Sequence, residues 1–254
     1  MKKWIYVLLI FLLFGCTHPA EEKVTLTISA AASMKDVLHS IKEQYEAKHP
    51  SVQLSFNFAS TGTLKKQIEQ GAPVDLFISA SSDVFKELKQ KGFIIPRQND
   101  HLVYNELVLI ASKTGKAPIH SPEDLANKNI KAIAIGIPET VPAGAYAKQW
   151  LEAVHVWDQV KEKLILAKDV RQVLTYVESG NAEAGIVYRT DALSSKNVHI
   201  VAKAPSSSHE PIVYEAGVIQ SSPHKKETEQ FFNYLQGNEA KKIFKKFGFM
   251  LEER

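Results

Sequence analysis

Four short runs of small and hydroxyl-bearing residues could bind an anion through uncharged hydrogen-bond donors. They are residues 30–33 (AAAS), 60–63 (STGT), 142–144 (PAG) and 169–170 (DV). Each run precedes a stretch with helical spacing of apolar residues, so each would leave free backbone N–H groups at a helix start. Such groups suit an anion, because they add to nearby hydroxyls and to the positive end of the helix dipole. For one turn alone, the simpler role of Ser33, Ser60 or Thr61 is to cap its helix.

An internal repeat favours one shared site over four separate caps. Shifting residues 169–188 (DVRQVLTYVESGNAEAGIVY) back by 109 positions places Gly180 on Gly71 and Tyr188 on Ser79. A unit of turn, helix, glycine and strand that recurs in both halves indicates two related lobes. We therefore expect two lobes that face one cleft.

The segments that must position these turns alternate between strand and helix patterns. Strands are predicted at residues 24–30, 52–58, 74–78 and 132–137, and helices at residues 34–48, 83–91 and 145–154. The apolar run at residues 74–78 is typical of a strand covered on both faces in an α/β protein. The helical segments carry apolar residues three or four positions apart.

Two longer apolar segments flank the central part of the chain. Residues 102–111 and residues 211–220 read as long strands, each interrupted near its middle. We expect them to cross between the lobes and to act as two hinge strands. Lobe 1 would comprise residues 24–104 and 217–254, and lobe 2 residues 105–216.

The start of the chain has the pattern of a secretory signal. A basic start and a short apolar run precede Cys16, the only cysteine. The run is short for a membrane span, and a single cysteine excludes an intrachain disulfide or a cysteine metal cluster. The sequence LFGC resembles the bacterial lipoprotein signal, in which the cysteine is lipidated. We therefore expect a signal peptide at residues 1–16, ending at Cys16, and a polar tether at residues 17–23.

The charge balance argues against a nucleic-acid-binding protein. Lys and Arg number 31 and Asp and Glu 28, for a net charge of +3, whereas nucleic-acid binding calls for a basic patch or stripe. The lysines of residues 241–246 alternate with apolar residues at helical spacing, which predicts the solvated face of a terminal helix. The chain is long enough to bury a sizeable core in one or two domains.

Several motifs together resemble the molybdate-binding component of bacterial ABC importers, and the resemblance covers residues 24–249. They are AAAS at 30–33, GAPVDLFISA at 71–80, VPAG at 141–144, YAK at 146–148, DVR at 169–171, GIVY at 185–188 and FKKFGF at 244–249. The resemblance implies an α/β, two-lobed periplasmic-binding-protein fold of class II. Each lobe would be a mixed sheet flanked by helices, and two hinge strands would join the lobes.

The resemblance also implies a function and a site. The protein would capture molybdate, and also tungstate, in the interlobe cleft and deliver it to an ABC permease with its ATPase subunits. It would be a monomer, not an enzyme, anchored through lipid on Cys16 to the outer face of the cell membrane. Carried over by motif, the oxyanion contacts are Ser33, Thr61, Ala143, Val170 and Tyr188. No cofactor is implied, and molybdenum would be held only as the oxyanion.

Physical chemistry explains why a site for a dianion can lack charged side chains. Ser33, Thr61 and Tyr188 offer hydroxyls, while Ala143 and Val170 offer only backbone N–H groups. A divalent oxyanion loses hydration in a closed cleft, and these donors would replace it. Because N–H groups cannot accept hydrogen bonds, they favour a fully deprotonated anion. Molybdate, tungstate and sulfate all meet that demand near neutral pH. The sequence leaves sulfate or phosphate open as an alternative ligand.

Other classes of protein fit the sequence less well. A secreted hydrolase would use a turn serine, but the chain has no Gly-x-Ser-x-Gly or His-Glu-x-x-His motif, and its nine histidines are scattered. An effector-sensing regulatory domain of the same fold would be preceded by a DNA-binding helix-turn-helix segment. In this sequence the expected binding lobes are preceded by the pattern of a secretion signal. Asp75 and Asp169 lie near the turns but would repel an anion, so we expect them to cap helices or bind backbone.

Overall fold

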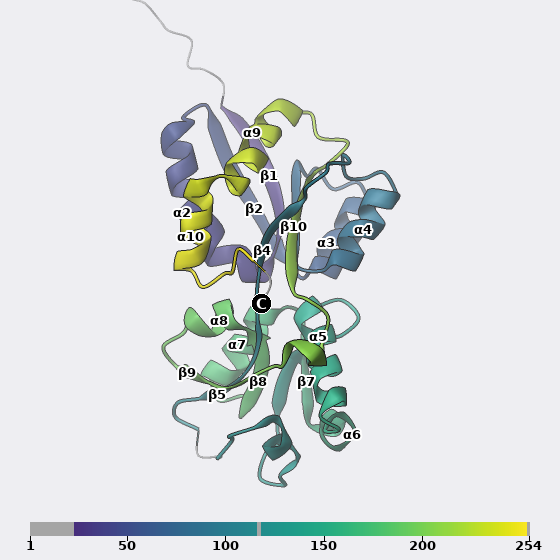
Figure 1. The fold of residues 1–254 in the computed structure, drawn as a ribbon, viewed down its shortest axis with the longest axis vertical. Helices are drawn as coiled ribbons and strands as arrows, with labels where there is room; N and C mark the ends of the chain where they lie inside the picture. The colour runs from purple at the N-terminus through teal and green to yellow at the C-terminus, as the bar shows by residue number, and fades with distance from the viewer. Residues whose placement is uncertain (1–22, 116–117, 253–254) are drawn as a thin grey trace, which may run out of the picture.

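The structure is a computed structural model and describes residues 23–115 and 118–252. The predicted signal peptide, its Cys16 and residues 17–22 of the predicted tether lie outside the described residues. Two lobes follow one another along the long axis of the molecule, each with its own sheet and helices (Figure 1). The predicted two-lobed α/β fold is confirmed.

The first lobe contains a five-stranded mixed sheet in the order β2-β1-β3-β10-β4. Its strands are β1 (Val24–Ala31), β2 (Val52–Ala59), β3 (Leu76–Ser79), β4 (His101–Tyr104) and β10 (Val213–Val218). Its helices are η2 (Ala32–Met34), α2 (Lys35–Lys48), α3 (Thr61–Glu69), α4 (Ser82–Gln90), α9 (Lys225–Gln236) and α10 (Asn238–Lys246). Strand β1 runs parallel to β2 and β3, while β10 runs antiparallel to β3 and β4.

The second lobe repeats this arrangement, with the order β7-β6-β8-β5-β9. Its strands are β5 (Leu107–Ser112), β6 (Ile133–Gly136), β7 (Leu164–Ala167), β8 (Ala184–Tyr188) and β9 (Val198–Lys203). Its helices are η3 (Pro122–Ala126), α5 (Pro142–Ala153), α6 (Trp157–Val160), η4 (Lys161–Lys163), α7 (Val170–Glu178), α8 (Arg189–Leu193) and η5 (Ser206–Ser208). Strand β6 is parallel to β7 and β8, and β5 is antiparallel to β8 and β9.

The predicted internal repeat is confirmed at the level of individual elements. Helices α3 and α7 each have nine residues, and each is followed within two residues by a glycine with positive φ. These are Gly71 (φ 83°) and Gly180 (φ 74°), and no atom lies within 4 Å of an added Cβ at either. Glycine is therefore required at each helix end by the left-handed backbone conformation. It is not required by crowding from neighbouring atoms.

One of the two predicted crossings between the lobes agrees with the structure, and the other differs. Residues 102–111 are interrupted at Asn105 and Glu106, as predicted, and the chain passes there between β4 and β5, which belong to different sheets. Strand β10 is continuous through residues 215–216 and lies wholly in the first sheet, with a bulge after Tyr214. The lobe boundary expected after residue 216 falls inside that strand, so we propose to place the second crossing before β10.

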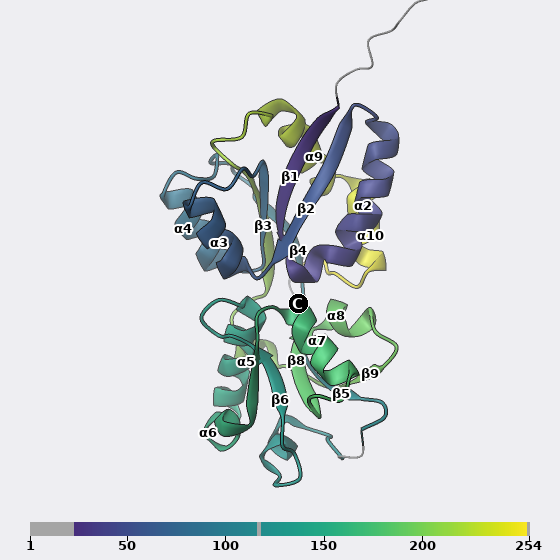
Figure 2. The same cartoon turned by 180° about the vertical axis from the view of Figure 1, so that it is seen from behind.

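One cluster of buried apolar residues extends through both sheets, and a smaller one lies beneath α3 and α4. This packing fixes the strand ends that face the other lobe. Seen from behind, α5 and α7 of the second lobe begin close to the junction with the first (Figure 2), and α7 contacts η2 across it. Within the described residues, no helix has the length and apolar character needed to cross a membrane.

Candidate functional site

A small cavity lies between the lobes, and all four of the predicted turns line it. Its lining residues are Ala31, Ala32, Ser33, Ala59, Ser60, Thr61, Ala80, Val141, Pro142, Ala143, Asp169, Val170 and Tyr188. Its volume of about 10 Å³ is far below the roughly 300–1,000 Å³ of sites for drug-sized ligands. The cavity therefore restricts its ligand to a small ion or molecule.

All five residues expected to bind an oxyanion lie on this lining, although they come from distant parts of the chain. The lining contains no lysine or arginine, so the hydrogen-bond donors that it offers are uncharged N–H and O–H groups. Ser33 and Thr61 belong to the first lobe, and Ala143, Val170 and Tyr188 to the second. Ligand binding by these residues stays a prediction. The hydrogen bonds that each residue forms indicate which donors are available to a ligand.

Thr61 is oriented as a donor toward the cavity. Ser60, the residue before α3, caps the helix, because its Oγ accepts a hydrogen bond from the Thr63 N–H at 3.3 Å. The fully buried Thr61 is therefore free of the capping role. Its Oγ1 accepts a hydrogen bond from the Ala80 N–H at 3.1 Å, which leaves the hydroxyl proton available to a ligand.

Tyr188 ends β8 with a hydroxyl that has no hydrogen-bond partner in the described part of the chain. The side chain is only 2% exposed. Burial raises the pKa of Tyr188 well above its usual value, so the hydroxyl stays protonated and can donate. A buried hydroxyl without a partner costs about 1–3 kcal/mol, and a ligand in the cavity would supply the missing acceptor.

Ala143 and Val170 present backbone N–H groups at the starts of α5 and α7. In α5 the Gly144 and Ala145 N–H groups both bond to the Val141 carbonyl, at 2.8 and 3.1 Å. In α7 the Asp169 side chain accepts from the Gln172 N–H at 2.9 Å. The N–H groups of Ala143 and Val170 have no such partner among the residues that the structure describes, so both are free to bind an anion.

Ser33 lies in η2 and does not cap a helix, because the capping positions are Ala31 and Met34 and neither forms a side-chain cap. Ser33 is 7% exposed, and its Oγ lies 2.7 Å from the Tyr214 Oη. The helix-cap role that the sequence left open thus applies to Ser60 and does not apply to Ser33.

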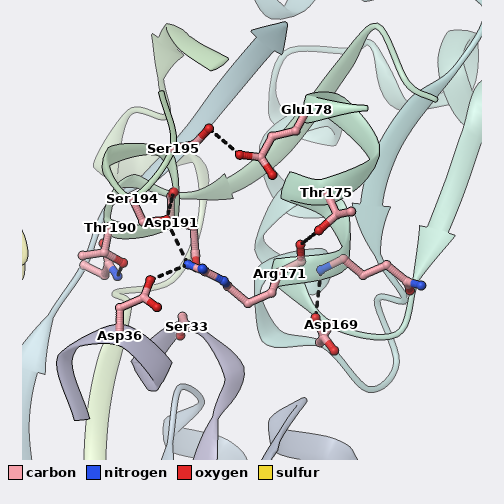
Figure 3. Close-up of polar contacts among 12 residues, drawn as sticks. Ser33, Asp36, Asp169, Arg171, Thr175, Glu178, Thr190, Asp191, Ser194 and Ser195 are labelled. Carbon is pink, nitrogen blue, oxygen red and sulfur yellow. Dashed lines mark hydrogen bonds and ion pairs between the residues drawn. The ribbon is translucent and has the colours of Figure 1, made fainter. Parts of the chain in front are cut away.

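The two aspartates near the turns bind backbone and hydroxyl groups, as predicted. Asp169 caps α7 through Oδ1, and its side chain turns back to its own helix (Figure 3). Asp75 accepts from the Thr27 N–H at 2.7 Å and from the Ser222 hydroxyl at 2.5 Å. Among the described residues, no group of three or more His, Cys, Asp or Glu side chains could hold a metal ion.

A charged cluster lies beside the cavity and was not predicted from the sequence. It consists of Asp36, Arg171, Asp191 and Ser194 (Figure 3). The Arg171 Nη1 lies 3.0 Å from Asp36 Oδ2 of the other lobe, 3.5 Å from Asp191 Oδ1 and 2.9 Å from Ser194 Oγ. The sequence showed Arg171 only as part of a motif, because no local spacing relates it to Asp36.

The backbones of the two lobes also touch beside the cavity. The Gly62 N–H donates to the Thr140 carbonyl at 3.0 Å. A Cβ at position 62 would lie 2.7 Å from that oxygen, so this approach requires glycine. The two lobes are therefore in direct backbone contact beside the cavity.

Comparisons with known proteins identify relatives over nearly the whole chain. Residues 26–250 match the family described as bacterial extracellular solute-binding protein. The chain is 48% identical to YvgL of Bacillus subtilis, a candidate ABC transporter substrate-binding lipoprotein, over 98% of this chain and 97% of that protein. It is 37% identical to the molybdate-binding protein ModA of Haemophilus influenzae, over 98% of this chain and 99% of that protein.

A solved structure extends the comparison to three dimensions. The periplasmic molybdate-binding protein of Azotobacter vinelandii superposes with a TM-score of 0.78 at 25% sequence identity. The match covers 90% of this chain and 100% of that one.

Proposed function

Because the chain belongs to the family of bacterial extracellular solute-binding proteins, we propose that it captures molybdate in the cavity between its lobes. The family consists of solute-binding proteins and not of enzymes. The alternative that this protein is a secreted hydrolase is therefore set aside. Relatives that share 36–37% of its sequence over nearly its whole length are named as molybdate-binding proteins. Tungstate presents the same tetrahedral dianion, so we propose that it binds as well.

The observation that carries this proposal is the Tyr188 hydroxyl, buried at the cavity without a partner among the described residues. The two side chains on the lining that accept hydrogen bonds as helix caps, Ser60 and Asp169, are already bonded to backbone N–H groups of their own helices. Thr61 can donate to the ligand, because its oxygen accepts a hydrogen bond from the Ala80 N–H and its own proton remains available. Ala143 and Val170 offer N–H groups from helix starts. A ligand that only accepts hydrogen bonds matches this set, and a fully deprotonated oxyanion is such a ligand.

We further propose that the protein is a lipid-anchored monomer that delivers its ligand to an ABC permease with its ATPase subunits. The LFGC sequence at Cys16 supports the anchor on the outer face of the cell membrane, as does the lipoprotein name of the Bacillus relative. Mass spectrometry of the membrane fraction tests the anchor: we expect Cys16 at the mature N-terminus with lipid attached. An unmodified Cys16 would contradict it.

Calorimetric titration with molybdate, tungstate, sulfate and phosphate tests the ligand. We expect molybdate and tungstate to bind more tightly than sulfate and phosphate. Tight binding of sulfate or phosphate without binding of molybdate would show that the protein transports another tetrahedral oxyanion.

A matched pair of variants on α3 tests the site. Thr61→Val removes the hydroxyl at the cavity with little change of shape, and we expect molybdate binding to weaken roughly 10- to 150-fold, the range for a hydrogen bond to a charged group. Thr63→Val removes from the same helix an exposed hydroxyl that lies 2.8 Å from the Ser60 Oγ. Ser60 keeps its cap bond from the Thr63 N–H, so the dissociation constant should change at most about 3-fold. Equal effects of the two would remove Thr61 from the site.

A further inference from the structure

We propose that Tyr214 and Asn105 fix the direction of the Ser33 hydroxyl, so that Ser33 meets the bound oxyanion only as a donor. This inference rests on the proposed function. Neither Tyr214 nor Asn105 lines the cavity, so both would act as positioning residues, through Ser33.

Asn105 has a fixed amide orientation. Its Oδ1 lies 2.9 Å from the Glu106 N–H, and a backbone N–H can only donate, so the atom that meets it must be the amide oxygen. The amide nitrogen therefore faces the Thr190 Oγ1 at 2.9 Å and the Tyr214 Oη at 3.3 Å. Asn105 thus donates a hydrogen bond to the Tyr214 Oη.

The bond from Asn105 determines which group donates in the hydrogen bond between Tyr214 and Ser33. The ring is fully buried, and burial raises the pKa of Tyr214 well above its usual value, so the phenol stays protonated. Its oxygen accepts from Asn105, and its single proton remains for the Ser33 Oγ at 2.7 Å. Tyr214 is therefore the donor in its bond with Ser33.

Ser33 then has one proton and no competing acceptor. Its Oγ accepts from Tyr214, and the described residues provide no other partner for its hydroxyl. The Ser33 proton is available to the cavity, in which Thr61 and Tyr188 also present donors. The bond from Tyr214 occupies one of the two lone pairs of the Ser33 oxygen. A hydroxyl without this bond could more readily turn a lone pair to the ligand and accept a hydrogen bond from it. Fixing the donor direction favours an anion without protons.

The network also connects the site to the crossing between the lobes. Asn105 lies where the chain passes from β4 to β5, and Thr190 lies on α8 of the second lobe. The orientation of a first-lobe donor is thus set by the crossing segment and by the second lobe.

A double-mutant cycle tests the proposal, with molybdate titrated into the full chain, Tyr214→Phe, Ser33→Ala and the double variant. We expect Tyr214→Phe to weaken binding about 2- to 10-fold, because Ser33 keeps its hydroxyl but loses its fixed direction. Ser33→Ala should weaken it roughly 10- to 150-fold. In the Ser33→Ala background, Tyr214→Phe should have no further effect, since residues that act through one another are not additive.

Tyr45→Phe is the matched control. Tyr45 is a fully buried tyrosine of the same lobe, and no residue that the structure describes partners its hydroxyl. This variant should bind molybdate as the unchanged chain does. Tyr214→Phe binding equal to that of the unchanged chain would overturn the proposal. So would an equal weakening by Tyr214→Phe with and without Ser33, which would indicate a structural role.

The experiment separates this proposal from the proposed function. An unchanged chain that bound sulfate but not molybdate would refute molybdate binding. The same cycle, run with sulfate, would then decide the role of Tyr214: loss of its effect in the Ser33→Ala background would support it, and a retained effect would overturn it.

Discussion

The cavity and the charged cluster lie side by side between the lobes and use opposite chemistry. The cavity presents hydroxyls and backbone N–H groups, with no cationic side chain on its lining. The charged cluster joins Arg171 of the second lobe to Asp36 of the first (Figure 3). The boundary between the two regions falls between neighbouring residues of α7: Val170 lines the cavity, and Arg171 belongs to the cluster.

The difference shows how a cation can lie close to an anion site without taking part in it. Arg171 is held by the carboxylates of Asp36 and Asp191 and by the Ser194 hydroxyl. A cation in the cavity would attract many anions, whereas fixed neutral donors select by geometry and by the absence of protons. Charged side chains therefore join the lobes at the cluster, whereas the donors on the cavity lining are uncharged.

The largest effect on affinity is expected from Val170→Pro, which removes the N–H of the first residue of α7. Proline is favoured at this position, and the preceding Asp169 has the extended backbone that proline requires (φ −160°, ψ 169°). The fold should therefore survive. We expect about a 100-fold or greater loss of molybdate affinity by calorimetry.

Val170→Ala keeps the N–H and serves as the control for this substitution. It should bind within about 3-fold of the unchanged chain, since apolar truncation leaves the donor in place. If the proline variant bound equally well, Val170 would not contact the ligand.

Tyr188→Phe should separate binding from stability. Affinity should fall roughly 10- to 150-fold, for the loss of a hydrogen bond to a charged ligand. The ligand-free protein should be equally stable or more stable, because the variant removes a buried hydroxyl that has no partner among the described residues. Thermal unfolding measures the second quantity. Lower stability with unchanged affinity would assign Tyr188 to the core.

Asp36→Asn probes the charged cluster and should have a smaller effect. Asp36 and Arg171 are 38% and 29% exposed, and such pairs contribute about 0.2–1 kcal/mol. We expect molybdate binding to weaken at most about 5-fold at low salt and the difference to vanish at high salt. Loss of a carboxylate near an anion site would by itself strengthen binding, so tighter binding would show that the pair does not hold the lobes together.

Asp191→Asn should affect affinity least and change the pH dependence of stability. Burial raises the pKa of Asp191 from 3.8 to about 7, against the opposing influence of Arg171. The folded protein then holds a proton that the unfolded chain releases, so this residue lowers stability as pH rises from about 4 to about 7. Chemical denaturation across that range should show a flatter profile for the variant. Parallel profiles would place the pKa of Asp191 near its usual value.

Local sequence signals predicted much of the site. Helix starts arise from residues adjacent in the chain, and a helix start carries its own free N–H groups. The turns at Thr61, Ala143 and Val170 could therefore be located before the fold was known, and each lines the cavity. The two-lobed fold followed from the internal repeat, since units with matching patterns form matching elements.

Contacts between distant residues could be decided only by the tertiary structure. The sequence could not determine that Ser60 caps α3 while Thr61 faces the cavity, or that Ser33 bonds to Tyr214. It did not relate Arg171 to Asp36, and it extended the second long segment across the lobe boundary, although β10 lies wholly in the first sheet, because apolar spacing does not reveal which sheet a segment enters. Hydrogen bonds and ion pairs between such residues depend on how the lobes pack, whereas helix starts and strand patterns are properties of the local chain.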